Sequence, residues 1–109
     1  MLPLSVARNY YLRLPDGRAL GHVRIDRLID SWAEGPFTPA PAFEDFRELF
    51  DREAQLRHEQ VIPLWEQAAD AIEALGIQVV EEGERSSHSQ LRVFVEGSDA
   101  IIGTQLSPP

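Results

Sequence analysis

The 109-residue sequence contains no cysteine and no lysine, and none of its apolar runs is long enough to cross a bilayer. Without cysteine the chain has no disulfide framework, no thiol nucleophile and no thiolate metal site. A membrane-spanning helix needs about 20 predominantly apolar residues. The first residues also lack the charged leader and apolar segment of a signal peptide. We therefore expect a single domain over residues 1–109, located in the cytoplasm.

Because lysine is absent, all ten basic side chains are arginines, a bias typical of a GC-rich genome. The chain is acidic, with a net charge of -8, and the charge is unevenly distributed. Residues 1–33 carry five arginines and three aspartates, whereas residues 34–85 carry thirteen acidic residues and four arginines. Carboxylates repel phosphates, so a general nucleic-acid-binding function is not expected.

The pattern of residues 9–25 predicts an N-terminal β-hairpin. Two β-prone runs, about 9–15 and 18–25, flank Pro15, which presets a turn, and Gly17, which accepts a positive φ. Strand alternation sorts the side chains into two faces. One face holds Tyr10, Leu12, Leu14, Val23 and Ile25. The other holds Tyr11, Arg13, His22 and Arg24.

The next segments are predicted from apolar spacing and from glycine and proline content. Ile25, Leu28, Ile29 and Trp32 recur at helical spacing, which predicts a short helix over residues 26–34. Gly35, Pro36, Pro39 and Pro41 make residues 35–42 a loop.

A longer helical period runs through residues 42–75 and ends at Gly76. One straight helix of this length would span about 50 Å, too long for a domain of this size. Pro63 removes a backbone hydrogen bond, so we expect a bent helix with arms of about 42–60 and 63–75.

Residues 77–106 are predicted to form C-terminal strands at 77–82, 91–97 and 100–106. The expected fold is α+β, with the order β-β-α-α-β-β-β. A mainly antiparallel sheet of about five short strands packs against the long proline-kinked helix. Both faces of the C-terminal strands are apolar, with Val93, Val95 and Ile101 on one side and Phe94 and Ile102 on the other. Either the 26–34 helix or another chain should cover the second face.

One candidate site is a ligand cleft beside the bent helix, formed by Glu53, Arg57, His58 and Trp65. Glu53 and Arg57 are spaced i, i+4, which favours an ion pair. They also interrupt the apolar stripe of the helix, so the pair would face a cleft between the helix arms. The alternative is a solvated pair on a helix segment that extends beyond the sheet. His58 and Glu59 do not form a catalytic dyad, because adjacent helix side chains diverge, and Ile62 stands where a zinc-binding HExxH motif needs histidine.

The other candidate site is a partner-binding surface formed by Tyr11, Arg13, His22 and Arg24, because aromatic and arginine side chains are enriched in interface hot spots. No catalytic set converges in the sequence, and we expect neither a cofactor nor a metal. The leading hypothesis is therefore a small acidic protein-protein interaction module of the accessory-subunit, inhibitor, immunity or adaptor type. Its partner is another protein or a second copy in a homodimer. A ligand-binding or minor enzymatic site in the helix cleft is the alternative, and a nucleic-acid mimic is the third hypothesis.

Overall fold

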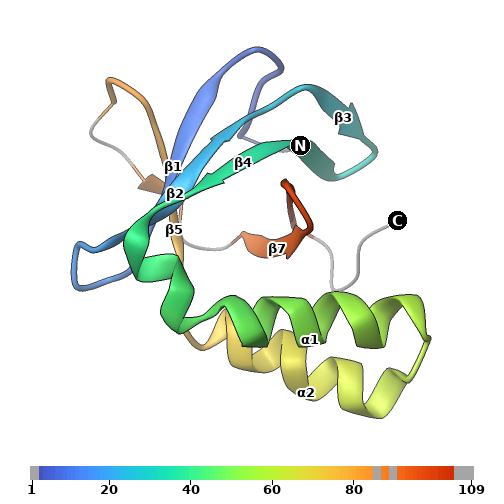
Figure 1. The fold of residues 1–109 in the computed structure, drawn as a ribbon. Coiled ribbons are helices and arrows are strands. Elements are labelled where there is room, and N and C mark those ends of the chain that lie inside the picture. The colour runs from blue at the N-terminus through green and yellow to red at the C-terminus, as the bar shows by residue number, and fades with distance from the viewer. Residues whose placement is uncertain (1–2, 85–86, 89–90, 105–109) are drawn as a thin grey trace.

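The chain folds into a curled antiparallel sheet with two helices packed at one end (Figure 1). This computed structural model describes residues 3–84, 87–88 and 91–104. In chain order the elements are β1 (Asn9–Arg13), β2 (Ala19–Arg24), β3 (Arg27–Ile29), β4 (Trp32–Pro39), the 3-10 helix η1 (Pro41–Asp45), α1 (Arg47–His58), α2 (Ile62–Glu73), β5 (Gln78–Glu81), β6 (Ser87–His88), β7 (Arg92–Glu96) and β8 (Asp99–Gly103). The α+β class is confirmed, but the described residues form eight strands rather than about five.

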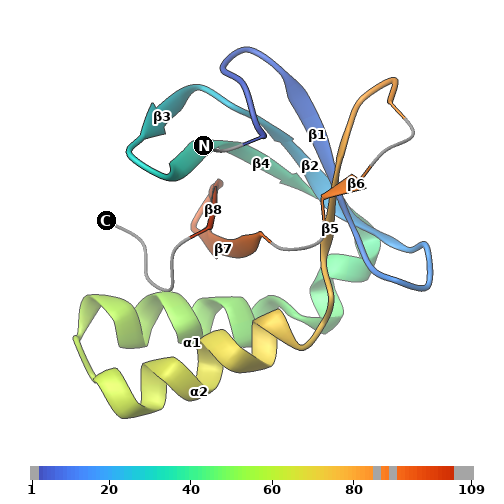
Figure 2. The same cartoon turned by 180° about the vertical axis from the view of Figure 1, so that it is seen from behind.

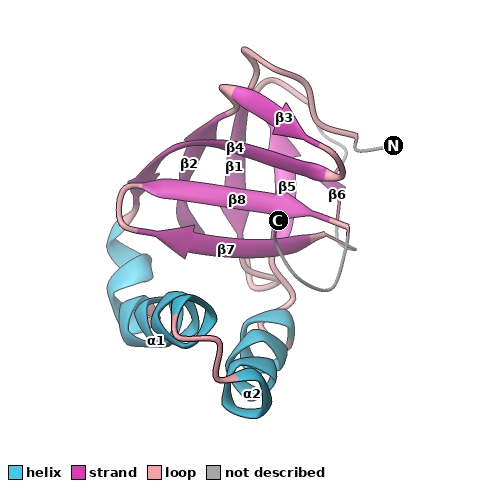
Figure 3. Cartoon of the chain, turned by 90° about the vertical axis from the view of Figure 1, so that its right-hand side faces the viewer, coloured by secondary structure: helices cyan, strands magenta, loops and turns pink. Residues whose placement is uncertain are grey.

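The long strand β4 joins the two halves of the sheet. The strand order is β6-β5-β1-β2-β4-β8-β7, with β3 paired beside β4. Residues 37–39 of β4 pair with β2, whereas residues 32–36 pair with β8. Gly35 lies near this change of partner, where a Cβ would fall 1.7 Å from the carbonyl oxygen of Arg24. The sheet therefore curls, so that β7 and β8 cross in front of β1, β2 and β5 (Figure 3), while β6 extends it beyond β5 (Figure 2).

The N-terminal hairpin forms as predicted. Tyr11 pairs with His22, and Tyr10 with Val23, across β1 and β2. Gly17 takes the positive φ of 94° that the turn requires. The predicted inner residues Tyr10, Leu12, Leu14, Val23 and Ile25 are all buried. They form one continuous core with side chains of β7 and β8.

The predicted helix at 26–34 is wrong. Residues 27–29 and 32–34 instead pair as the antiparallel strands β3 and β4. The chain reverses at Asp30, whose φ of 53° lies in the left-handed region. Asp enters this region more readily than most residues. Apolar side chains at i, i+3, i+4 and i+7 fit a helix, but they also fit two short strands joined by a tight turn.

The predicted loop at 35–42 is also wrong in most of its length. β4 continues to Pro39, and η1 begins at Pro41. Pro36 is tolerated within β4 because β3 pairs only with residues 32–34 and β2 only with residues 37–39. Position 36 therefore has a neighbour only in β8.

The long bent helix predicted at 42–75 is two separate helices. α1 ends at His58, and α2 begins at Ile62 and runs antiparallel to it (Figure 1). The backbone N–H of Gln60 donates to the carbonyl of Arg57, and that of Val61 donates to the carbonyl of Leu56. With Gln60 at a φ of 57°, this is a Schellman ending. Pro63 lies in the first turn of α2, where it needs no hydrogen-bond partner, so it opens a helix instead of bending one.

The C-terminal strands form close to their predicted places, but two residues point to the wrong face. Val93 pairs with Ile102 and Phe94 with Ile101, so Ile102 shares the inner face with Val93, and Ile101 lies on the opposite face. The end of the last predicted strand, residues 105–106, lies outside the described residues.

The chain's own helices cover the second apolar face of β7. The ring of Phe94 lies 6.2 Å from that of Trp65 in α2, measured between centroids, and 5.6 Å from the Arg57 guanidinium in α1. Neither a 26–34 helix nor a second chain is needed to bury it, so this face gives no argument for a homodimer. Among the described residues, no helix is both long and apolar enough to span a membrane.

Candidate functional site

The predicted partner-binding residues Tyr11, Arg13, His22 and Arg24 lie together on the outward side of the N-terminal hairpin, here called the hairpin face. Tyr11 is 41% exposed and stacks edge-on against His22, with ring centroids 5.2 Å apart. The Tyr11 hydroxyl donates to a carboxylate oxygen of Glu82 at 3.4 Å, at the border of the face. The register sets this arrangement, because Tyr11 and His22 are directly paired and Arg13 and Arg24 follow at the outward positions.

The arginines of the hairpin face differ from most others in the chain. Six of the nine arginines in the described residues form ion pairs with carboxylates: Arg8, Arg18, Arg27, Arg47, Arg57 and Arg92. Arg13 instead donates to the amide oxygen of Gln78 at 3.1 Å. Within the described part of the chain, Arg24 and Arg52 have neither an ion pair nor a side-chain hydrogen bond. Two of the three unneutralised arginines therefore share one face.

A shallow apolar hollow of about 220 Å³ adjoins the same face. Its lining comes from β1, β2, the end of β4 and the residue that follows it: Tyr11, Ala19, Gly21, His22, Thr38, Pro39 and Ala40. Its volume exceeds that of an aliphatic side chain. The sequence predicted the aromatic and cationic residues of this face but not the hollow. The β4 residues that line it lie in the segment 35–42, which was predicted to be a loop.

The predicted cleft residues Glu53, Arg57, His58 and Trp65 also come together. Glu53 is fully buried. One of its carboxylate oxygens accepts from Arg57 Nε and from Trp65 Nε1, each at 2.7 Å, and the other accepts from Arg57 Nη2 at 3.2 Å. The solvated pair expected on an overhanging helix is therefore wrong, because this pair lies between the helices and β7.

Two residues of β7 complete this network and were missed from the sequence. Glu96 lies 3.4 Å from Arg57 Nη1 and also contacts His58 Nε2, and Phe94 lies under the Arg57 guanidinium. No local signal could have found them, because they lie about forty positions further along the chain. Arg57 thus bridges α1 to β7 through charge, hydrogen bonding and a cation–π contact.

The Glu53 end of this network is closed to a substrate. Glu53 and Trp65 are buried, and neither the hollow at the hairpin face nor the cavity beside Arg92 is lined by any of the four predicted cleft residues. A ligand would reach the Glu53 carboxylate only if α1 and α2 separated. The arrangement anchors the two helices to the sheet and keeps the Glu53 carboxylate buried, whereas the side chains of His58 and Glu96 at its edge remain accessible to solvent.

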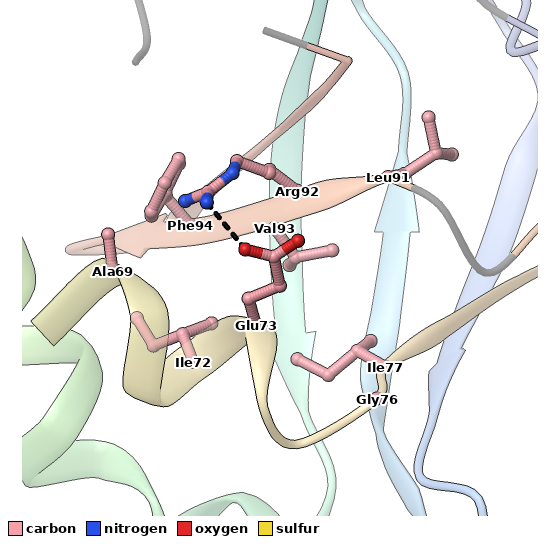
Figure 4. Close-up of a pocket in the computed structure, with 9 residues that line it drawn as sticks. All are labelled: Ala69, Ile72, Glu73, Gly76, Ile77, Leu91, Arg92, Val93 and Phe94. Atoms are coloured by element: carbon pink, nitrogen blue, oxygen red, sulfur yellow. Dashed lines mark hydrogen bonds and ion pairs between the residues drawn. The ribbon is translucent and has the colours of Figure 1, made fainter. Parts of the chain in front are cut away.

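A small cavity of about 40 Å³ lies beside Arg92, between the end of α2 and β7 (Figure 4). Arg92 Nη2 donates to Glu73 at 2.5 Å and lies 3.6 Å from Asp70, while its Nη1 is buried without a partner in the described residues. The two carboxylates disfavour an anionic ligand here, and the volume holds only about two or three waters. A water molecule in this cavity would satisfy the unpaired Nη1 of Arg92.

Metal ligation has no visible basis in the part of the chain that the structure describes. No group of three or more His, Asp or Glu side chains lies close enough together to hold an ion. His22, His58 and His88 belong to β2, α1 and β6.

Comparison with known proteins adds no assignment: no family model, no curated protein and no solved structure matches this chain. Any functional assignment therefore rests on the geometry of the two candidate sites.

Proposed function

We propose that this protein is a protein-binding module that uses the hairpin face to hold an acidic surface of its partner. The observation that carries the proposal is the concentration of unneutralised arginines. In a chain of net charge -8, most guanidinium groups have a carboxylate partner of their own, but those of Arg13 and Arg24 have none in the described residues. Neither charge is neutralised within the described part of the chain, so both can pair with carboxylates of another molecule.

The chemistry of the hairpin face supports this role. A guanidinium group pairs with a carboxylate through two parallel hydrogen bonds, which fixes orientation as well as adding affinity. The Tyr11 and His22 rings supply a rigid, half-exposed aromatic centre between the two arginines. The adjoining hollow would receive an apolar side chain from the partner. An apolar centre with a charged rim is the usual anatomy of a protein interface.

The experiment compares capture of partners from a lysate of the source cells by three immobilised proteins: wild type, Arg24→Glu and Arg52→Glu. Arg52 is the matched control, because it is also an exposed, unpaired arginine but lies on α1. Arg24→Glu should weaken the binding of a captured partner by roughly tenfold in Kd, about 1.4 kcal/mol. Arg52→Glu should not.

Salt provides a second test of the same interaction. Exposed charges are screened over about 10 Å at 0.1 M salt, so the difference between Arg24→Glu and wild type should shrink as salt rises. Equal capture of the same partners by all three proteins at low salt would remove the hairpin face from the interaction.

A further inference from the structure

The turn between α1 and α2 exposes an uninterrupted apolar segment. Val61, Ile62, Pro63 and Leu64, here called the helical tip, are all exposed, and Ile62 reaches 52%. The preceding Schellman turn fixes the backbone of this segment, and Trp65 immediately after it is buried and hydrogen-bonded to Glu53. The helical tip is therefore a preorganised apolar projection, not a loose loop.

The charges around the helical tip are opposite to those of the hairpin face. Glu59 precedes it and Glu66 follows it, both exposed and neither in an ion pair within the described residues. The nearest arginine, Arg57, is already engaged by Glu53 and Glu96. The helical tip thus presents aliphatic side chains flanked by carboxylates without an ion-pair partner, whereas the hairpin face presents an apolar hollow flanked by guanidinium groups without a carboxylate partner.

We propose that the occupant of the hairpin face is the helical tip of a second copy of this chain. This inference rests on the proposed function and names its partner. An aliphatic side chain of the helical tip, Ile62 or Leu64, would enter the hollow beside Tyr11 and His22, and Glu59 and Glu66 would meet Arg13 and Arg24. The charge match favours a second copy over a lipid surface, because anionic headgroups repel a segment flanked by free carboxylates.

The contact would be heterologous, joining two different surfaces. The helical tip lies at the far end of the helix pair, whereas the hollow lies at the end of β4 just before η1, at the opposite end of the molecule (Figure 1). Each added copy therefore leaves one free tip and one free face, and such contacts build head-to-tail chains instead of a closed dimer. One tip in one hollow is a small interface, so the association should be weak and concentration-dependent.

Sedimentation velocity from micromolar to millimolar concentration tests the inference. Wild type should progress from the 12.3 kDa monomer to dimers and longer species as concentration rises. Ile62→Asp should weaken this association by roughly tenfold or more, as expected for a central apolar anchor. The matched control is Val6→Asp, which places the same charge on a residue 48% exposed outside the helical tip. Leu64→Gln repeats the test without adding a charge, in case Ile62→Asp disturbs the turn.

Mixing two variants gives the decisive result. Arg13→Glu/Arg24→Glu has an intact tip but an altered face, and Ile62→Asp has an intact face but an altered tip. At a concentration at which wild type associates, each variant alone should be mostly monomeric. An equimolar mixture should form dimers and nothing larger, because only one productive contact is available. Circular dichroism confirms that each variant is folded before mixing.

The outcomes separate this inference from the proposed function. A wild-type protein that stays monomeric to millimolar concentration, or one that associates while the mixed variants do not, overturns the second copy as occupant. In either case, capture of another partner that Arg24→Glu loses and Arg52→Glu keeps would leave the proposed function standing. Two results together would contradict both proposals: Arg24→Glu captures the same partners as wild type, and Arg13→Glu/Arg24→Glu self-associates as strongly as wild type.

Discussion

The buried carboxylate of Glu53 links α1 to α2. This carboxylate is fully buried and depends on Arg57 and Trp65 for all three of its hydrogen bonds. Arg57 is itself only 17% exposed and also contacts Glu96. A buried charge pair is expensive to desolvate, but removing one partner is costlier still, because it leaves the other charge uncompensated.

Glu53→Gln should therefore lower the free energy of unfolding by about 3 kcal/mol, measured by urea denaturation. A solvated pair would have cost at most about 1 kcal/mol. Glu44→Gln is the control, since it breaks an exposed pair with Arg47 in the adjoining segment and should leave the unfolding midpoint nearly unchanged. Replacing both partners, as in Glu53→Leu/Arg57→Met, should recover much of the loss. If Glu53→Gln and Glu44→Gln lower the free energy of unfolding equally, burial does not make the Glu53 pair more important to stability than an exposed pair.

Asp16 in the first hairpin turn offers a test based on titration. The backbone N–H of Arg18, and then its guanidinium group, hold the pKa of the Asp16 carboxyl below its ordinary value. A pKa lowered in the folded state stabilises the fold above the unfolded pKa, and this contribution is lost as the pH falls through the folded pKa.

In an NMR titration the Asp16 carboxyl should have its midpoint below that of an aspartate in an unfolded peptide. Arg18→Gln should return only part of the shift, because the backbone N–H is the largest cause and remains. Complete return to the ordinary value would assign the shift to the guanidinium instead.

The candidate residues were predictable as two groups, but their roles were not. The i, i+4 spacing of Glu53 and Arg57 correctly predicted their contact, and strand alternation correctly placed Tyr11 and His22 outward. Whether Glu53 is solvated depends on β7, which arrives about forty residues later and brings Phe94 and Glu96. Helical spacing carries no information about such a distant strand.

At the scale of elements, the predicted strands were correct on either side of two turns made by glycine. The predicted elements were wrong at two turns made by other residues. The hairpins turning at Gly17 and Gly97, whose φ values are 94° and 58°, lie close to their predicted places. The chain reversals at Asp30 and Gln60 also need positive φ, at 53° and 57°, but neither residue signals it clearly. A hairpin was consequently predicted as a helix, and a pair of helices as one bent helix.

The strain at Gln60 yields a prediction about stability. Gln60 occupies the C′ position of the Schellman ending of α1, where glycine is usual because it lacks a Cβ. Gln60→Gly should raise the free energy of unfolding by roughly 0.5–1 kcal/mol, despite the greater freedom of glycine in the unfolded chain. Gln67→Gly, in the exposed middle of α2, should lower it by about 0.5–1 kcal/mol.

Both substitutions are read by urea denaturation. A loss of stability in Gln60→Gly as large as in Gln67→Gly would show that the turn is not under backbone strain.

At the scale of the whole molecule, the helices and the sheet are joined by contacts of several kinds. Glu53, Arg57 and Glu96 connect α1 to β7, and Arg92 of β7 contacts Glu73 and Asp70 of α2. Phe50, Trp65 and Ile72 of the helices belong to the same buried cluster as the sheet residues. The two parts should therefore unfold together, as expected for a single domain.

The two tryptophans allow this cooperativity to be measured, because one lies in each part. Trp32 lies in β4, next to Phe94, and Trp65 lies in α2. Trp65→Phe leaves a fluorescent probe in the sheet, and Trp32→Phe leaves one in the helices.

Trp65→Phe also removes the hydrogen bond to Glu53 and should be less stable than wild type, so unfolding midpoints are compared within each variant and not between variants. In both, the urea midpoint from tryptophan fluorescence should coincide with that from far-ultraviolet circular dichroism, which reports the helices most strongly. If Trp32 fluorescence in Trp65→Phe changes at higher urea than the dichroism signal, the sheet outlasts the helices, and the contacts through Arg57 and Arg92 do not make the molecule one cooperative unit.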